Sequence, residues 1–370
     1  MSSIKRANIA IVYLGFLSLL AILVFIFLKQ NEATSLQYFE GKDFQIRKVG
    51  RFDTGPKLVP RTYAPGAYFE FAFSGSTCEV VLEDEIRFGN LHNTIVYQVD
   101  DQKPVRLTLS SKQNKIMLHI HSKAAKHLVR VCKATEATLG YIGLIGLRCE
   151  RLLPTKRPKL LFEFIGDSIT CGNGADNSKV PFGEGDWYAY HNAYMSYGPL
   201  LCRTLGADWQ LSSVSGIGLN KSCCGLRYQM PEVYGFIGFN TYKKPWAFHR
   251  YRKPNVVFVT LGQNDALKNQ TQASAYEKDY LAFLNKLRRY YPKATLICCN
   301  SPMATPAQKE RLNESIQKVV KQLRQQKDTN IHFFAYQGVY RAGNDKHPTL
   351  QQHQLIKTEL LGFVKRMGLG

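Results

Sequence analysis

The stretch LLFEFIGDSITCGNG, residues 160–174, decides how this sequence is interpreted. Its first half is a short apolar run that is typical of a buried strand, and its second half changes at once to glycine and polar residues. A serine placed directly after a buried strand has two explanations: it caps a helix, or it is a nucleophile held at the edge of a sheet. The rest of the chain decides between them.

Strand and helix patterns alternate along the second half of the chain. Apolar runs of strand length occur at residues 160–166, 208–214, 255–262, 294–299 and 331–336, and helical periodicity occurs at 192–206, 272–291, 306–326 and 350–367. This alternation is typical of an α/β domain built on a parallel, doubly wound sheet, which we place at residues 153–370. In such sheets, binding and catalytic residues gather at the carboxyl ends of the strands.

An all-β pattern precedes this domain, at residues 33–152. Short runs of alternating apolar and polar residues follow one another between residues 67 and 150, and turn signals such as Ser74-Gly75-Ser76 separate several of them. The runs are YFEFAF, TCEVVLED, TIVYQVD, VRLTLS, KIMLHI, HLVRVC and YIGLIGL. Short strands at this spacing predict a β-sandwich.

The N-terminal residues 1–32 predict a membrane anchor. Residues 9–28 carry no charged side chain, and as a helix they measure ~30 Å, the thickness of the hydrocarbon core of a bilayer. Lys5 and Arg6 before this run place the N-terminus in the cytoplasm and the rest of the chain outside, in the periplasm or the extracellular space. The residues after the run do not resemble a signal-peptidase site, so we expect an uncleaved transmembrane helix, with a removed signal peptide as the alternative.

The chain is strongly basic, with 49 Lys and Arg residues against 28 Asp and Glu residues and a net charge of +21. Such a surface keeps a protein soluble, and it also attracts anionic lipid or an acidic glycan. Nucleic acid is not an expected partner, because the sequence has no zinc finger, no RNA-binding aromatic motif and no long run of Lys and Arg.

Nine cysteines include two adjacent pairs, Cys223-Cys224 and Cys298-Cys299. An odd number cannot pair completely, and the spacing shows no small disulfide framework. Cys298-Cys299 lie in the strand pattern ATLICC, where buried thiols are expected. No CxxC motif is present, and His119 and His121 on one strand face have no evident third ligand, so we expect no metal site.

Residues that can support catalysis follow four of the predicted strands. Ser168, Gly216 and Asn264 each come shortly after a different strand pattern, and His347 lies beyond the last one. Each alone has a structural explanation, which is a helix cap for Ser168, a tight turn for Gly216 and a turn for Asn264. His347 stands just before a capping-box pattern and therefore on a loop. Their arrival at one edge of the sheet favours a shared site.

Together these residues fit the hydrolysis of an acyl ester. A serine hydroxyl is a weak nucleophile that needs a base, and His347 can take the proton of Ser168 and return it to the leaving alcohol. The tetrahedral oxyanion needs hydrogen-bond donors. We expect the backbone N–H groups of Ser168 and Gly216 and the side-chain amide of Asn264 to supply them. The reaction needs no cofactor.

The motifs GDSI and GQND and a late His-Pro resemble those of the SGNH, or GDSL-type, hydrolases. Over residues 40–365 the chain is also similar to carbohydrate esterase family 2. The similarity lies in the order of a β-rich front domain and the stretches FIGDSITCGNG, NAYMSYGPLLCRTLGADWQLSSVSGIGL, PEVY and LGQNDA. The resemblance implies a jelly-roll domain followed by a flavodoxin-like SGNH hydrolase domain. It also implies removal of O-acetyl groups from a polysaccharide or other glycan through an acetyl-serine intermediate.

Carried over by position, the resemblance makes Ser168 the nucleophile and His347 the base, with Gly216 and Asn264 completing the oxyanion hole. It assigns Trp246 to an aromatic position that lines the sugar site, although core packing explains a tryptophan equally well.

The residue that orients His347 departs from the common SGNH pattern. SGNH enzymes commonly have Asp three residues before the His, where this chain has Asn344, and Asp345 stands two residues before it. We expect the Asp345 carboxylate to orient the imidazole. A main-chain carbonyl, as in some members of family 2, is the alternative.

Two other functions are compatible with these patterns. A lipid or thioester hydrolase uses the same scaffold, and the anchor and the basic charge suit it. A non-catalytic glycan-binding protein is the alternative from a different class, because the front domain resembles a carbohydrate-binding sandwich. The β-rich domain favours a sugar substrate over a lipid, and the residues at the four strand ends favour catalysis over binding alone.

Overall fold

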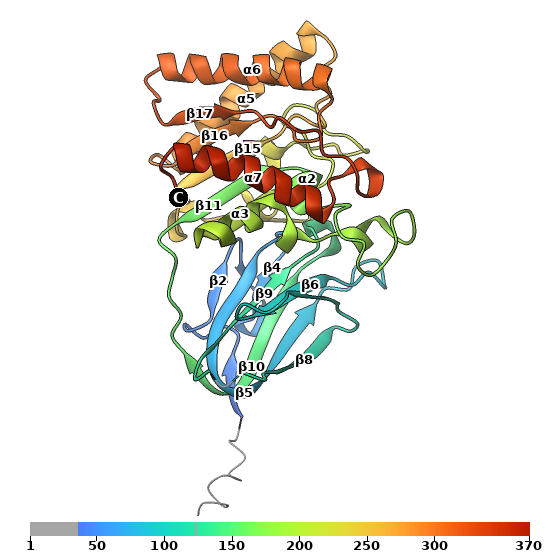
Figure 1. Cartoon of the computed structure of the whole chain (residues 1–370), viewed down its shortest axis with the longest axis vertical. Helices are drawn as coiled ribbons and strands as arrows, with labels where there is room; N and C mark the ends of the chain where they lie inside the picture. The colour runs from blue at the N-terminus through green and yellow to red at the C-terminus, as the bar shows by residue number, and fades with distance from the viewer. Residues whose placement is uncertain (1–35, 123) are drawn as a thin grey trace, which may run out of the picture. The chain divides into compact units, whose positions relative to one another are not determined.

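The computed structural model describes residues 36–122 and 124–370. The predicted anchor at residues 9–28 lies outside these residues, and among the described ones no helix is both long and apolar enough to cross a bilayer. Residues Tyr38–Gly370 form one compact unit, in which an all-β region is followed along the chain by an α/β region (Figure 1).

Five parallel strands form the sheet of the α/β region, in the spatial order β12–β11–β15–β16–β17. They are β11 (Leu161–Gly166), β12 (Asp208–Ser213), β15 (Val256–Thr260), β16 (Thr295–Cys299) and β17 (Ile331–Phe334). The first of these strands along the chain therefore lies between the second and the third, which is the flavodoxin-like order of a doubly wound sheet. The predicted parallel α/β fold is confirmed.

Two pairs of long helices cover the sheet (Figure 1). Helices α3 (Tyr197–Leu205) and α7 (Leu350–Arg366) pack together on one face, and α5 (Gln270–Tyr290) and α6 (Pro306–Gln325) pack together on the other. The observed ends of these helices agree with the predicted ends to within about two residues, except that α3 begins later than predicted. Helix ends cannot be defined more closely than this, because assignment methods differ by one or two residues.

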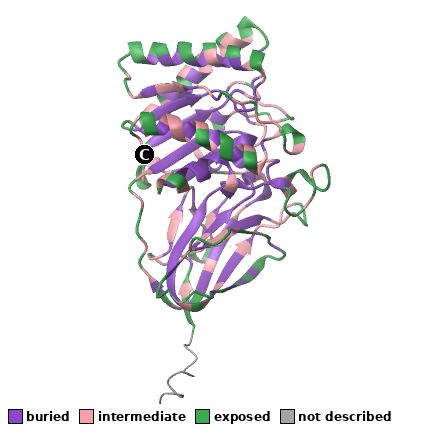
Figure 2. Ribbon diagram, viewed as in Figure 1, coloured by how far each residue is buried: buried purple, intermediate pink, exposed green. Residues whose placement is uncertain are grey.

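Successive residues of the strands face opposite pairs of helices, as expected for buried parallel strands. Phe162, Phe164 and Phe258 belong to the core beneath α3 and α7, and Val257 and Val259 belong to the core beneath α5 and α6. Figure 2 shows the sheet buried between helices whose outer surfaces are exposed. Burial on both faces explains why these strands are continuous apolar runs in the sequence.

Short elements complete the α/β region. They include α2 (Ser168–Cys171), α4 (Met230–Val233) and the hairpin of β13 (Phe236–Gly238) and β14 (Tyr242–Pro245). Helix α2 follows β11 directly, and Asp167 begins it as the N-cap by accepting a hydrogen bond from the Ile169 N–H at 3.0 Å.

The all-β region is a network of antiparallel strands that agrees with the predicted jelly-roll sandwich. Its strands are β1 (Gln37–Glu40), β2 (Arg47–Val49), β3 (Asp53–Thr54), β4 (Pro60–Thr62), β5 (Tyr68–Asp84), β6 (Thr94–Val99), β7 (Val105–Thr108), β8 (Gln113–His119), β9 (His127–Lys133) and β10 (Ile142–Leu153). The main path is β3–β4–β10–β5–β9–β6–β7, and β2 and β8 both pair with β5.

One strand of this region differs from its prediction. The runs YFEFAF and TCEVVLED, predicted as separate strands around the Ser74-Gly75-Ser76 turn, form the single strand β5. Gly75 adopts a φ of 103°, which bends the strand without ending it. Residues 68–73 pair with β9, and residues 77–83 pair with β8. One bent strand therefore pairs with different neighbours before and after Gly75.

Buried polar contacts join the all-β region to the α/β region. The guanidinium of Arg51 donates hydrogen bonds to the carbonyls of Tyr234 and Phe236 at 2.6 and 2.8 Å and to Ser212 Oγ at 3.0 Å. Its Nη2 also lies 3.6 Å from the carboxylate of Glu163 in β11, and neither side chain is accessible to solvent. Removing one partner of such a pair leaves the other charge buried and poorly compensated, so this contact couples the two regions.

We expect Arg51→Met to lower the free energy of unfolding by about 3–5 kcal/mol, because Glu163 then loses its buried cation. Urea unfolding of the full-length chain in detergent measures the change. Arg148→Met is the matched control, since Arg148 is 53% exposed in its pair with Glu79, and it should cost less than about 1 kcal/mol. Equal losses in the two variants would show that Arg51 does not couple the regions.

Candidate functional site

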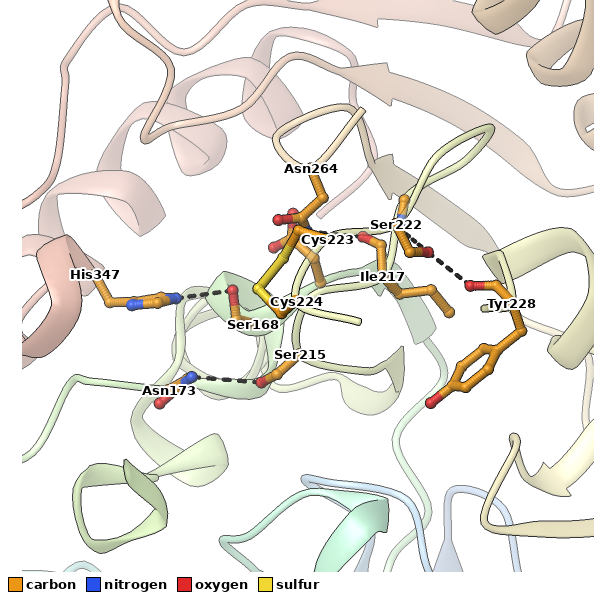
Figure 3. The surroundings of a disulfide bond; sticks show 12 residues. Ser168, Asn173, Ser215, Ile217, Ser222, Cys223, Cys224, Tyr228, Asn264 and His347 are labelled. Atoms are coloured by element: carbon orange, nitrogen blue, oxygen red, sulfur yellow. Dashed lines mark hydrogen bonds between the residues drawn. A yellow bond between two sulfur atoms is a disulfide. The ribbon is translucent and has the colours of Figure 1, made fainter. Parts of the chain in front are cut away.

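A serine–histidine pair lies at the carboxyl edge of the parallel sheet (Figure 3). Ser168 comes shortly after β11 as the first residue of α2, and His347 stands just before α7. The Nε2 atom of His347 lies 2.8 Å from Ser168 Oγ. The expected meeting of these two side chains, which are far apart in the sequence, is confirmed.

The backbone of a short turn orients the imidazole of His347. Its Nδ1 lies 3.2 Å from the carbonyl oxygen of Asn344. A carbonyl can only accept, so Nδ1 carries the proton and Nε2 is left to accept one from the Ser168 hydroxyl. The Gly174 carbonyl anchors the turn by accepting a hydrogen bond from the Asn344 N–H at 3.0 Å.

The prediction that the Asp345 carboxylate orients His347 is wrong. Asp345 is exposed, and its carboxylate accepts a hydrogen bond from the Asn344 side chain at 3.1 Å, while the Asn344 carbonyl takes the place beside the imidazole. The cause is a left-handed backbone, with φ of 49° at Asp345 and 59° at Lys346. The alternative prediction, that a main-chain carbonyl orients His347, matches this geometry.

Burial lowers the pKa of His347 below its ordinary value of 6.5, because a charged imidazolium is poorly solvated at this position. The Asn344 carbonyl and the negative charge of Asp345 act in the opposite direction, since both favour the charged ring. A lowered pKa keeps Nε2 unprotonated at neutral pH, which a general base requires.

Two further loops, after β12 and β15, lie at the same edge of the sheet as Ser168. Gly216, in the loop after β12, has a φ of 77°, a conformation that a side chain disfavours. Asn264, after β15, donates from Nδ2 to the Ile217 carbonyl at 2.8 Å and lies 3.4 Å from the Asp167 carboxylate. Figure 3 shows Asn264 and Ile217 together with Ser168 and His347. The residues predicted for the oxyanion hole therefore follow three neighbouring strands at the carboxyl edge of the sheet.

Asp265, the residue after Asn264, fixes the loop after β12. Its buried carboxylate accepts hydrogen bonds from the backbone N–H groups of Leu219, Asn220 and Lys221 at 3.0, 2.6 and 2.9 Å. Burial raises the pKa of Asp265, and these donors act against the rise. The residue next to Asn264 thus holds the loop that carries Gly216.

Glu136, from the connection between β9 and β10 of the all-β region, reaches the same loop. It is 1% exposed, and it accepts hydrogen bonds from the Ser215 N–H at 2.8 Å and from Thr138 Oγ1 at 2.7 Å. Ser215 immediately precedes Gly216, so the all-β region helps to hold one of the expected oxyanion donors. No local sequence pattern marks Glu136, because the contact depends on how the two regions pack.

Trp246, predicted to line a sugar site, is packed in the core instead. Its side chain is 5% exposed and stacks on Tyr251 with 3.8 Å between ring centroids. It borders a hollow with Lys253 and Arg289 toward the amino end of β15, whereas Ser168 follows the carboxyl end of β11. Core packing, the alternative explanation of this tryptophan, therefore fits its position.

Trp187, which the sequence did not single out, is an exposed aromatic residue on the loop that adjoins the histidine turn. It is 42% exposed and meets the ring of His191 edge to face, with 4.9 Å between centroids. The same loop is joined to the turn, because the Gly183 N–H donates to Asn344 Oδ1 at 3.0 Å. Such an aromatic face is suited to stacking on a sugar ring. Exposure distinguishes it from Trp246, and exposure is not visible in the sequence.

Two family models match the chain. Residues 48–155 match the carbohydrate esterase 2 N-terminal model, and residues 164–355 match the GDSL-like lipase/acylhydrolase family. The second match takes in more than half of the chain and includes Ser168, Gly216, Asn264 and His347.

Relatives found by sequence carry the names of esterases. The cellulase/esterase CelE of Acetivibrio thermocellus is 27% identical over 332 residues, which cover 85% of this chain and 39% of that protein. An acetylxylan esterase/glucomannan deacetylase of Cellvibrio japonicus is 27% identical over 338 residues, which cover 90% of this chain and 91% of that protein. The chain thus spans well under half of the first relative and nearly all of the second.

Solved structures show the same two-part architecture. A family two carbohydrate esterase from Clostridium thermocellum, in complex with cellohexaose, has a TM-score of 0.78 at 26% identity and covers 88% of this chain and 100% of its own. A family two carbohydrate esterase from Cellvibrio japonicus has a TM-score of 0.80 at 24% identity, with 90% and 98% covered. The second likeness establishes the fold alone.

We expect Asp345→Asn to keep kcat/KM for a chromogenic ester within about tenfold of the wild type at its plateau. Replacing an orienting carboxylate by its amide costs about 10⁴ instead. Loss of the Asp345 charge should also lower the pKa of His347 further, so the rate should fall at a lower pH than in the wild type as pH decreases. The pH profile of kcat/KM checks both points, and a loss near 10⁴ would return the orienting role to Asp345.

We expect Glu136→Ala to lower kcat by up to about 10²-fold with little change in KM, because the Ser215 N–H loses its acceptor and Gly216 shifts. Glu136→Gln keeps an oxygen acceptor and should stay close to the wild type. Steady-state kinetics with the same ester measures both, and Glu310→Ala on the exposed face of α6 is the control. Equal rates for Glu136→Ala and the wild type would contradict the role of this contact.

Proposed function

The chain belongs to the GDSL-like lipase/acylhydrolase family and has a carbohydrate esterase 2 N-terminal domain, and we propose that it removes O-acetyl groups from a carbohydrate. The observation that carries the proposal is the 2.8 Å contact between Ser168 Oγ and His347 Nε2 at the edge of the sheet. The esterases named among its relatives support a carbohydrate as the substrate class.

In the first step, Ser168 Oγ attacks the carbonyl carbon of the acetyl ester while its proton passes to His347 Nε2. The backbone N–H groups of Ser168 and Gly216 and the amide of Asn264 hold the resulting oxyanion, and each such donor is typically worth about 10²–10³ in rate. The bond from the carbonyl carbon to the sugar oxygen then breaks. His347 gives the proton to that oxygen, which leaves an acetyl-serine and a free sugar hydroxyl.

In the second step, a water molecule attacks the acetyl-serine and His347 takes one of its protons. The tetrahedral intermediate uses the same donors. When the bond from the carbonyl carbon to Ser168 Oγ breaks, the proton returns to the serine and acetate leaves. Throughout, the Asn344 carbonyl holds the Nδ1 proton and so keeps Nε2 aimed at the serine.

We place this esterase outside the cytoplasm, tethered to the membrane by residues 9–28. The uncharged length of that segment and Lys5 and Arg6 before it support the placement. The net charge of +21 suits work close to anionic lipid or on an acidic polymer of the cell envelope.

We expect the full-length chain in detergent to release acetate from acetylated xylan or from O-acetylated peptidoglycan, and from 4-nitrophenyl acetate. Ser168→Ala should reduce that release on the order of 10³-fold or more, because no other group replaces the nucleophile. Acetate assay of the supernatant measures both.

Ser110→Ala, at an exposed position of the all-β region, is the matched control and should keep full activity. Acetate release that survives Ser168→Ala would overturn the assigned nucleophile. Binding of a glycan without any acetate release would favour a non-catalytic function, and cleavage of long-chain lipid esters alone would favour a lipase.

A further inference from the structure

A disulfide between adjacent residues, Cys223 and Cys224, lies in the loop between β12 and α4. The other cysteines of the chain are free thiols, and all of them are buried. Cys224 by contrast is exposed and Cys223 is half-buried. This pair therefore faces the surface on the loop that carries Gly216, and neither the fold nor the proposed reaction accounts for it.

The disulfide is attached directly to Gly216. The Cys223 N–H donates to the Gly216 carbonyl at 2.8 Å. A Cβ atom placed on Gly216 would lie only 3.3 Å from Cys223 Sγ, so the sulfur covers the side of Gly216 on which a side chain would stand. The residue expected to stabilise the oxyanion thus has a sulfur atom as its immediate neighbour.

Figure 3 shows the disulfide beside Ser168, across it from His347. Asn264 lies next to the disulfide in the same view. In this view the two sulfur atoms lie on the side of Ser168 opposite to the base.

The loop holds the disulfide firmly in this place. Ser222 Oγ accepts from the Gly218 N–H at 3.0 Å and donates to the Tyr228 carbonyl at 2.6 Å. The carboxylate of Asp265 binds the preceding stretch through three backbone N–H groups. Cys224 itself has a φ of 59°, within a small ring that the disulfide closes. A wall built in this way cannot move aside easily for a bulky group.

The orientation of the bound ester determines which part of it contacts the disulfide. The leaving oxygen of the ester must lie near His347 Nε2, which protonates it, and the carbonyl oxygen must point to Gly216 and Asn264. The acyl chain takes the remaining direction, away from His347. In Figure 3 the Cys223–Cys224 disulfide lies on the side of Ser168 away from His347, and its polarizable sulfur atoms are suited to contact with a methyl group.

We propose that the Cys223–Cys224 disulfide forms the wall of the acyl site and restricts the enzyme to acetyl groups. The inference rests on the proposed function and deepens it, because it names the group that excludes longer acyl chains. An acetyl methyl packs against the sulfur atoms, whereas the further carbons of a butyryl group meet them.

The test compares kcat/KM for the 4-nitrophenyl esters of acetate, propionate and butyrate, with the full-length chain in detergent. We expect the wild type to prefer acetate. In Cys223→Ala/Cys224→Ala the ratio of butyrate to acetate should rise at least about tenfold, since one methylene at a fitted site is worth about 10–200-fold. Circular dichroism of the variant reports whether it is folded.

Reduction of the wild type is a second measurement that needs no folded variant. A water-soluble phosphine opens the disulfide to two thiols, and the exposure of Cys224 gives the phosphine access. The ratio of butyrate to acetate should rise on reduction and fall again on reoxidation. The double variant is the matched control, because reduction should leave its ratio unchanged.

A ratio that stays constant in both the variant and the reduced enzyme overturns the proposal. If all three esters slow down equally, the disulfide only braces Gly216 and does not select the acyl group. A wild type that hydrolyses butyrate as fast as acetate overturns the proposal but leaves the esterase intact. Hydrolysis that does not depend on Ser168 overturns the proposed function itself.

Discussion

The position of β11 between β12 and β15 is the constraint on which the site depends. In the parallel ladder, Gly166 pairs in register with Ser213 on one side and Thr260 on the other. The three strands therefore end at the same level, and the loops that follow them carry Ser168, Gly216 and Asn264 to one edge. Backbone hydrogen bonds between the buried strands thus set the positions of the loops, and with them the positions of the site residues that the loops carry.

The sequence predicted the parts of the fold that repeat a local pattern and missed those that depend on packing between regions. Buried parallel strands and amphipathic helices leave clear periods, so the α/β region and the meeting of Ser168 with His347 could be predicted. The partner of His347 could not, because a left-handed backbone at Asp345 decides between a carboxylate and a carbonyl. Trp246 and Trp187 have the same side chain, and only tertiary structure shows which one is exposed.

The all-β region is more than a separate binding module attached to a hydrolase. Arg51 places a buried cation near Glu163 in β11, and Glu136 accepts a hydrogen bond from the residue before Gly216. Contacts of this kind are buried, so they fix the relative position of the two regions more strongly than surface ion pairs do. The geometry expected of the oxyanion hole is therefore a property of both regions together.

The cysteines of this chain are consistent with one disulfide beside the site and thiols elsewhere, even in the oxidising surroundings proposed for the enzyme. Disulfide exchange needs a thiolate that an oxidant can reach. Burial raises the pKa of Cys132 and of Cys298 to about 12, so neither forms a thiolate at neutral pH, and neither is accessible. Cys224 is exposed and adjacent to its partner in the chain. Burial therefore decides which thiols react, and it directs oxidation to the loop that borders Ser168.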